Sequence, residues 1–203
     1  MTVYVESNFV LEQSLQQEEC DSCAELIDLA SKGRVLLAVP AFSLAEPHVA
    51  ISAKEKARSR LSNDLRHHLF ELGRSKPHRA VPATFEALAS IPIASAQLER
   101  DGLRDTISGL LQTAEVISLD AAILRSAAQV QAEFGMSGQD AIVLASVLAH
   151  LDLHHTPESC FLNRNSKDFD DPDVRERLEA RGCGFFASFG AGLRHIVARI
   201  GTE

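Results

Sequence analysis

The sequence predicts an α/β fold in which a central, mostly parallel sheet is flanked by helices. Short runs of β-branched, aliphatic or aromatic residues at 3–5, 35–39, 116–119 and 160–162 alternate with stretches of helical spacing. The run at 35–39 is apolar throughout, as in a strand that is buried on both faces of a parallel sheet. A chain of 203 residues can bury a sizeable core, and we expect one domain over residues 1–203.

The first half of the chain begins with a strand, a helix and a second strand. After the strand at 3–5, apolar residues recur with helical spacing over 11–30, and Lys32-Gly33 ends that helix. The strand at 35–39 leads into a helix that should begin near Phe42 or Ser43, because Pro47 lacks an N–H and is tolerated in a first turn. Residues 52–73 and 84–111 read as further helix, interrupted around Pro92. We interpret residues 52–114 as a helical insertion.

The second half returns to the sheet. A strand at 116–119 precedes a helix over 121–134 that is capped by Asp120, and Ser137 caps a buried helix over 141–151. A core strand at 160–162, a surface helix from Asp173, an edge strand at 185–186 and an amphipathic tail over 189–200 complete the predicted fold.

Composition gives an expected class and compartment. With 45% hydrophobic and 24% charged residues, the chain resembles an ordinary globular protein. It has neither a basic N-terminal leader nor an apolar run of roughly 18 residues, so we expect a cytoplasmic protein without a membrane partner. The lone Cys20-Asp-Ser-Cys23 lacks the second ligand pair of a structural zinc site, and we read the cysteines as reduced thiols.

The charge distribution points to a nucleic-acid partner. The net charge is −8, but residues 54–79 carry eight Lys/Arg against three acids, a local +5, which leaves −13 for the remainder. A basic arm beside an acidic pocket is compatible with RNA binding, and a solvated helix face is the alternative. His67 and His68 in this section lack converging ligands and are read as exposed or RNA-facing. The candidate RNA-binding residues are Arg58, Arg60, Arg66, Arg74 and Lys76.

Four acids follow strands or open helices: Glu6, Glu46, Asp140 and Asp168. In an open α/β sheet, strand ends and helix N-termini converge at one edge, where ligands bind. Carboxylates held close together repel one another unless a cation neutralises them. The sequence therefore predicts a divalent-metal site with Mg²⁺ or Mn²⁺.

The stretches around these acids resemble the motifs of the PIN-domain (PilT N-terminus) nucleases, particularly the bacterial toxin branch. That family has a strand ending in Asp-Thr/Ser-Asn, a helix with Ser-x-x-Glu, a helix opening Gly/Ser-x-Asp-Ala, and a final strand running into Thr/Ser-x-Asp/Asn-x-x-Asp-Phe. The matching stretches, within residues 1–51 and 115–170, are Glu6-Ser7-Asn8, Ser43-Leu-Ala-Glu46, Ser137-Gly-Gln-Asp140-Ala141 and Asn163-Arg-Asn165-Ser-Lys-Asp168-Phe169. The basic section has no counterpart in the short toxin members.

The resemblance implies a PIN-like three-layer fold and a Mg²⁺- or Mn²⁺-dependent endoribonuclease. It leaves open whether the chain is the toxin of a toxin–antitoxin pair, with an antitoxin protein as partner, and whether it forms a homodimer. It implies that Glu6, Glu46 and Asp140 bind metal directly or through water, and that Asp168 is a further ligand or a water-orienting base. Asn165 would be a neutral ligand. Ser7, Asn8 and Asn163 would hold the acids in place by hydrogen bonds.

Two departures from the family pattern keep other functions open. Glu6 replaces the leading Asp, which moves the carboxylate by one methylene, and Asn165 replaces an acid that many members carry. A catalytically impaired RNA-binding or scaffold protein is therefore an alternative. A receiver or haloacid-dehalogenase-like phosphotransfer domain also starts with an acid after the first strand, but Ser7-Asn8 offers no second acid beside Glu6.

Overall fold

The computed structural model describes residues 1–79, 81–154, 158–165 and 169–201. Its described part contains a parallel five-stranded sheet in the order β3-β2-β1-β4-β5, which confirms the predicted α/β class. The strands are β1 (Thr2–Val5), β2 (Leu36–Pro40), β3 (Glu115–Ile117), β4 (Ser159–Leu162) and β5 (Cys183–Phe186). Because all five run the same way, their carboxyl ends lie at one edge of the sheet.

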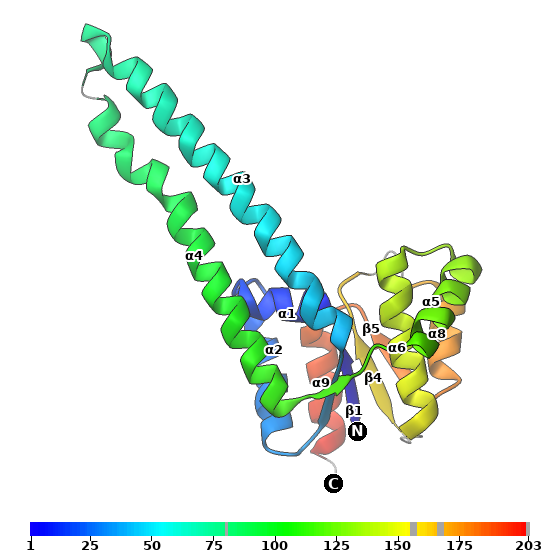
Figure 1. Ribbon diagram of the computed structural model, residues 1–203. Coiled ribbons are helices and arrows are strands. Elements are labelled where there is room, and N and C mark those ends of the chain that lie inside the picture. The colour runs from blue at the N-terminus through cyan, green and yellow to red at the C-terminus, as the bar shows by residue number, and fades with distance from the viewer. Residues whose placement is uncertain (80, 155–157, 166–168, 202–203) are drawn as a thin grey trace.

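Helices cover both faces of the sheet (Figure 1). One face carries α5 (Ala121–Phe134), α6 (Gly138–His154) and α8 (Pro172–Glu179). Alternate strand residues such as Tyr4, Ala38 and Phe161 pack into the core on that side. The other face carries α1 (Ser7–Ser14), α2 (Cys20–Ser31) and α9 (Phe189–Ile200), which pack on residues such as Val3 and Leu37. Because successive side chains along a strand point to opposite faces of the sheet, each strand contributes residues to two separate cores.

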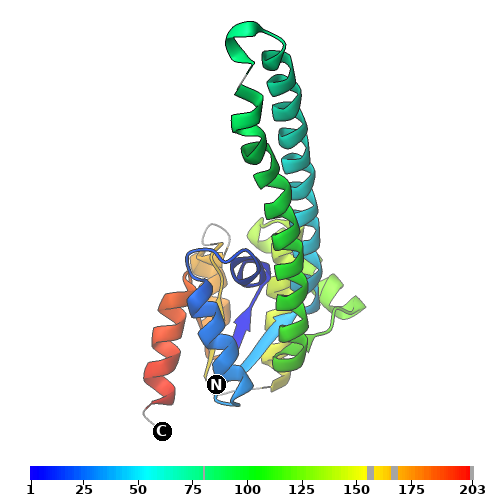
Figure 2. The ribbon, with the colours of Figure 1, turned by 90° about the vertical axis from the view of Figure 1, so that its left-hand side faces the viewer.

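Two helices of 33 residues each form a hairpin that projects away from the sheet (Figures 1 and 2). They are α3 (Ala41–Gly73) and α4 (Val81–Thr113), and the short 3₁₀ turn η1 (Lys76–His78) lies between them. Small residues permit their close approach: Ala89 and Ala96 are buried, and the buried Ser62 Oγ donates to the Ala89 carbonyl at 2.6 Å. The predicted helical insertion is therefore a hairpin continuous with the helix that follows β2.

Three helix boundaries differ from the sequence prediction. The stretch at 11–30 is two helices, because Gln16 adopts a left-handed φ of 49° and turns the chain between α1 and α2. Pro92 lies inside α4 without ending it, and packing against α3 on either side, through Ala89 and Ala96, stabilises the helix there. Since α3 begins at Ala41, Pro47 lies beyond its first turn and Glu46 lies in its second.

No single helix among the described residues is both long and apolar enough to cross a bilayer. The bent pair α5 and α6, at 117° to one another, meets that requirement only when the two are joined.

Candidate active site at the carboxyl edge of the sheet

Glu6 lies where β1 ends and α1 begins. It is the N-cap residue of α1, in an extended conformation, and only 6% of it is exposed. Its Oε1 atom is buried and has no hydrogen-bond partner among the residues that the structure describes. A buried carboxylate oxygen without a donor is costly, so this position favours a proton or a cation.

The pKa of Glu6 reflects this environment. Burial raises it from 4.5 to about 8, the backbone N–H of Asn8 opposes the rise, and the negative charges of Glu46 and Asp140 add to it. The side-chain amide of Asn8 also opposes it. Glu46 and Asp140 are therefore close enough to Glu6 to repel its charge, as three acids at one edge of the sheet should.

Glu46 reaches this edge from α3, directly after β2. Since β2 pairs with β1, the start of α3 lies beside the start of α1. The Ser7 hydroxyl donates a hydrogen bond to Glu46 Oε2 and so joins the two helices. Ser7 therefore orients a neighbouring acid, which is the kind of role that the motif resemblance implies for it.

Asp140 lies in the first turn of α6. The Ser137 hydroxyl accepts from the Asp140 N–H at 3.1 Å and donates to its Oδ2 at 2.6 Å, a reciprocal cap. The other carboxylate oxygen, Oδ1, accepts from the side-chain amide of Asn165 at 3.2 Å. The backbone N–H of Asn165 in turn donates to Asn163 Oδ1 at 2.7 Å, which fixes the turn after β4. Asp168, the fourth predicted acid, lies outside the described residues.

No protein-family model matches the chain, and no curated protein matches it. A chain in the crystal structure of VapBC2 from Rickettsia felis, bound to a DNA fragment from their promoter, is similar in structure. The two share 12% identity with a TM-score of 0.48, over 92% of this chain and 99% of that one.

The strand order and the convergence of Glu6, Glu46 and Asp140 at one edge come from the geometry of this chain itself. The chain thus has an α/β fold with acids gathered at the carboxyl edge of a parallel sheet. The α/β class that the sequence predicted is confirmed, and the resemblance to the PIN-domain nucleases rests on the motifs.

Beside the acids at the carboxyl edge lies an open groove of about 630 Å³. Asn8 and Asn165 line it, together with the cations Lys54 and Arg164. The Arg164 guanidinium pairs with Glu12, a carboxylate that is only 2% exposed and also accepts from the Glu19 N–H at 2.6 Å. The acids Glu12 and Glu18 line the groove as well, and Arg164 lies 3.6 Å from a Glu18 oxygen, so cations and acids alternate next to the acidic edge. Sequence reasoning missed Glu12 and Arg164, and the only signal was the place of Arg164 within the last motif.

The predicted RNA-binding cations lie along α3 and beyond its end. Arg58 is partly buried and pairs with Glu99 of α4 across the hairpin. Arg60 and Arg66 are exposed on α3. Arg74 follows α3, exposed and 3.6 Å from a Glu71 oxygen, and Lys76 opens η1. Arg58 thus has a structural partner, whereas the exposed cations face solvent.

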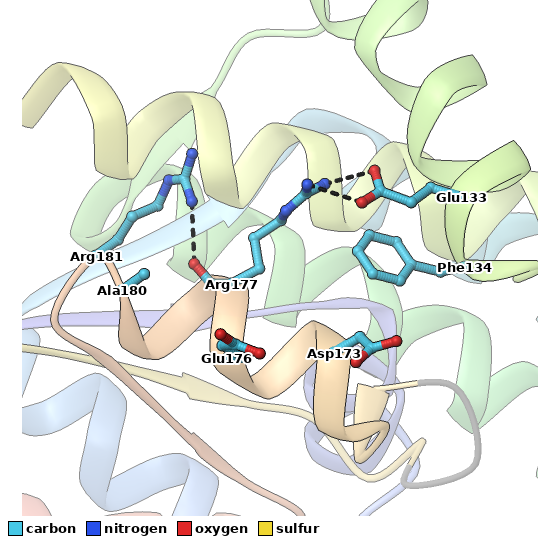
Figure 3. Close-up of a pocket in the computed structure, with 7 residues that line it drawn as sticks. All are labelled: Glu133, Phe134, Asp173, Glu176, Arg177, Ala180 and Arg181. Carbon is cyan, nitrogen blue, oxygen red and sulfur yellow. Dashed lines mark hydrogen bonds and ion pairs between the residues drawn. The ribbon is translucent and has the colours of Figure 1, made fainter.

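A separate hollow of about 400 Å³ lies between α5 and α8 (Figure 3). Arg177 donates from both its terminal nitrogens to Glu133, and Arg181 donates to the Arg177 carbonyl. The Arg177 guanidinium also lies over the ring of Phe134 at 5.0 Å. These contacts join two surface helices, and the acids Asp173 and Glu176 also line the hollow.

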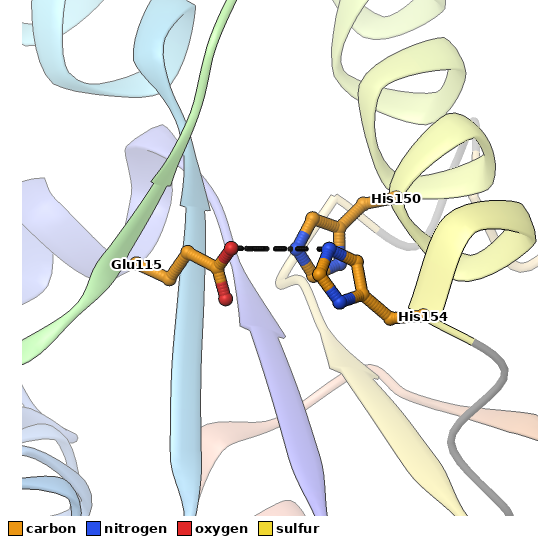
Figure 4. Close-up of side chains that lie close together, drawn as sticks. All are labelled: Glu115, His150 and His154. Atoms are coloured by element: carbon orange, nitrogen blue, oxygen red, sulfur yellow. Dashed lines mark ion pairs between the residues drawn. The ribbon is translucent and has the colours of Figure 1, made fainter.

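The donor atoms at the acidic edge suit a hard cation. Among the described residues, the one group of three His, Cys, Asp or Glu side chains with ligand atoms all within 4.8 Å is Glu115, His150 and His154, at the opposite edge (Figure 4). The three acids at the carboxyl edge are spaced more widely. Mg²⁺ binds through one or two carboxylates and keeps several waters, so a wider set with an unsatisfied Glu6 oxygen fits it.

Proposed function

We propose that the chain is a Mg²⁺- or Mn²⁺-dependent endoribonuclease that uses Glu6, Glu46 and Asp140 to bind the metal. The observation that carries the proposal is the unsatisfied, buried oxygen of Glu6 beside two further acids at the carboxyl edge of the sheet. Such a cluster is electrostatically unfavourable when all members are ionised, and a divalent cation removes the penalty.

The chain's own residues would hold this site in shape. Ser7 orients the Glu46 carboxylate, Asn165 orients Asp140, and Asn163 fixes the turn that carries Asn165. A bound Mg²⁺ or Mn²⁺ would supply a water of lowered pKa and would stabilise charge on a phosphodiester. Asp168 is proposed as a further ligand or a water-orienting base, on the motif alone.

Substrate binding would draw on the cations beside the acids. Lys54 and Arg164 line the groove beside the acids Glu12 and Glu18, and these two cations would contact a phosphate backbone there. The exposed cations Arg60, Arg66, Arg74 and Lys76 would add contacts along the length of the hairpin, on different sides of it, because helix positions six residues apart lie about 120° from one another. An extended polyanion such as RNA is the ligand that cations spread over this length would contact.

A catalytically impaired RNA-binding protein is the second candidate, and two observations favour it. Glu6 stands where the resembled family has Asp, and Asn165 gives Asp140 a neutral hydrogen-bond donor where many members offer another acid. Under this alternative the groove and hairpin would bind RNA with no cleavage.

The deciding experiment is an RNA-cleavage assay of the full chain with Mg²⁺ or Mn²⁺ and with EDTA. We expect endonucleolytic products that EDTA abolishes and that Asp140→Asn reduces at least a hundredfold. Asp120→Asn is the matched control, because Asp120 caps α5 through backbone N–H groups and Asn caps equally well. Cleavage that persists in EDTA, or in Asp140→Asn, would refute the metal mechanism. RNA binding with no cleavage in any metal would select the alternative.

The role as a toxin of a toxin–antitoxin pair rests on the motif resemblance and has its own test. Expression of the chain in bacteria should stop growth, and expression of Asp140→Asn should not. Unimpaired growth, together with cleavage activity of the chain, would mean that the protein is a nuclease without a toxin role.

A further inference from the structure

A second cluster of metal-ligand side chains lies at the opposite edge of the sheet (Figure 4). Glu115 Oε1 lies 3.3 Å from His150 Nε2 and 3.9 Å from His154 Nε2. The two imidazole rings are stacked, with centroids 4.0 Å apart. Both histidines thus turn their Nε2 atoms toward one carboxylate.

Local structure brings the three residues together from distant parts of the chain. His150 and His154 are four residues apart in α6, which places them on the same face of the helix. Glu115 is the first residue of β3 and is paired in register with Ala38, which is paired in turn with Tyr4. Tyr4 and Glu115 therefore share the α6 side of the sheet, with only the methyl group of Ala38 between them.

His150 is held in place by a buried tyrosine. It is only 4% exposed, and its Nδ1 lies 2.8 Å from the Tyr4 hydroxyl oxygen. Ligating histidines donate their second ring N–H to an oxygen, and the Tyr4 hydroxyl would accept from Nδ1–H in the tautomer that presents the Nε2 lone pair to a metal. The Nε2 atom is buried and makes no hydrogen bond to any described residue, although Glu115 is near. This buried nitrogen, 3.3 Å from Glu115 Oε1 but without a hydrogen bond to a described residue, therefore points into the space between the three side chains.

We propose that Glu115, His150 and His154 form a binding site for a transition-metal ion, Zn²⁺ in particular. Two imidazole nitrogens and one carboxylate are a ligand set that suits Zn²⁺ and disfavours Mg²⁺. With Zn²⁺ bonds of about 2.0–2.1 Å in a tetrahedron, neighbouring ligand atoms stand about 3.4 Å apart. The distance from Glu115 to His150, 3.3 Å, is close to that value, and the distance from Glu115 to His154, 3.9 Å, is longer. A water takes the fourth position on the exposed His154 side.

The ion would tie the base of the hairpin to the core. Glu115 follows α4 by two residues, and His150 and His154 lie in the last turns of α6. A shared metal would therefore clamp the end of the hairpin to the helix whose other end carries Asp140. This site is independent of the proposed nuclease, because its ligands are nitrogen-rich and lie at the other end of α6.

The test is calorimetric titration of the EDTA-treated full chain with Zn²⁺ in the presence of millimolar Mg²⁺. Co²⁺ absorption spectra would report the tetrahedral geometry, and thermal unfolding would report the stabilisation. We expect one Zn²⁺ per chain, a weakening of at least a hundredfold in His154→Ala, and about tenfold in Tyr4→Phe, which loses only the partner of Nδ1. His154 is 44% exposed, so its replacement leaves the core intact.

His68→Ala is the matched control, since His68 is an exposed histidine on α3 with another histidine beside it. Zn²⁺ binding that is equal in His154→Ala, His68→Ala and the unaltered chain would overturn the proposal. So would binding that Asp140→Asn abolishes, because the ion would then occupy the acidic edge. Absence of any bound Zn²⁺ in the unaltered chain would overturn it as well.

Discussion

The side-chain amide of Asn165 donates a hydrogen bond to Asp140 across 25 residues of sequence, at 3.2 Å. The contact joins the turn after β4 to the first turn of α6. It also puts a neutral donor beside an acid that already repels Glu6. The edge of the sheet therefore carries less negative charge than it would with an acid at this position.

Replacement of Asn165 by Asp should make the fold depend on metal. The variant loses the donor and adds a negative charge, so the metal-free chain should lose about 1–3 kcal/mol of unfolding free energy. Mg²⁺ affinity should rise about tenfold, because ligand charge sets the affinity of such sites. Denaturant unfolding in EDTA and in Mg²⁺ measures both effects. Asn165→Ala is the control, and an equal response of the two variants to Mg²⁺ would contradict the electrostatic argument.

Glu6 predicts a pH dependence of stability in the absence of metal. Its pKa is raised from 4.5 to about 8 by burial above all. The folded chain therefore binds a proton that the unfolded chain releases, so the stabilisation is complete below about pH 4.5 and is lost as the pH rises through about 8. Across this pH range, the free energy of unfolding should fall by an amount on the order of a few kcal/mol.

The difference between the unaltered chain and Glu6→Gln isolates this contribution. Unfolding free energies of both, measured in EDTA from pH 5 to 9, should diverge as the pH rises, with the Gln variant changing less. Saturating Mg²⁺ should remove most of the divergence. Parallel curves would mean that Glu6 titrates normally.

Glu6→Asp, which restores the carboxylate of the resembled family, should keep or increase cleavage.

The exposed arginines of α3 should carry RNA affinity. Replacement of Arg60 and Arg66 by Ala should weaken RNA binding and flatten its salt dependence by about one unit of slope per lost phosphate contact. Arg58 is left in place because it pairs with Glu99. Lys32→Ala with Arg125→Ala matches the charge change elsewhere on the surface. Unchanged RNA binding with an altered oligomeric state would make this surface a protein interface.

Two glycines of α4 form a matched pair for packing. A Cβ at Gly102 would lie 2.5 Å from the Ser14 carbonyl oxygen, whereas a Cβ at Gly109 would meet no atom within 4 Å. Gly102→Ala should destabilise the chain by about 1–3 kcal/mol because α1 and α4 must separate. Gly109→Ala should stabilise it by about 0.5–1 kcal/mol through helix propensity. Chemical denaturation measures the change in unfolding free energy of each variant. Changes of the same sign in the two variants would argue against the close approach of α4 to α1.

Much of the fold was predictable because it depends on local pattern. Apolar runs between polar turns predicted the strands, and the position of Glu6 and Glu46 after strands placed both at the carboxyl edge. The break between α1 and α2 was not predictable, because helical spacing continues through Gln16 while its backbone does not. Pro92 was expected to interrupt the helix, but α4 continues through it, because packing between α3 and α4 outweighs the loss of one hydrogen bond.

The candidate sites were predictable only where the contact partners were already known from a motif. Glu12 and Arg164 are separated by 152 residues, and nothing near Glu12 indicates a partner. The spacing of His150 and His154 was a readable signal for a shared helix face. Glu115 was not, because its place beside them depends on the register of β3 with Ala38.

The continuity of α3 gives the hairpin a mechanical meaning. Glu46 and Pro47 lie near the start of a helix that runs without a break to Gly73, roughly 40 Å further at 1.5 Å per residue. A tilt of about 5° about the start of α3 would move the far end by about 3–4 Å. A force on the tip would therefore act through a long arm on the start of α3, where Glu46 accepts from the Ser7 hydroxyl.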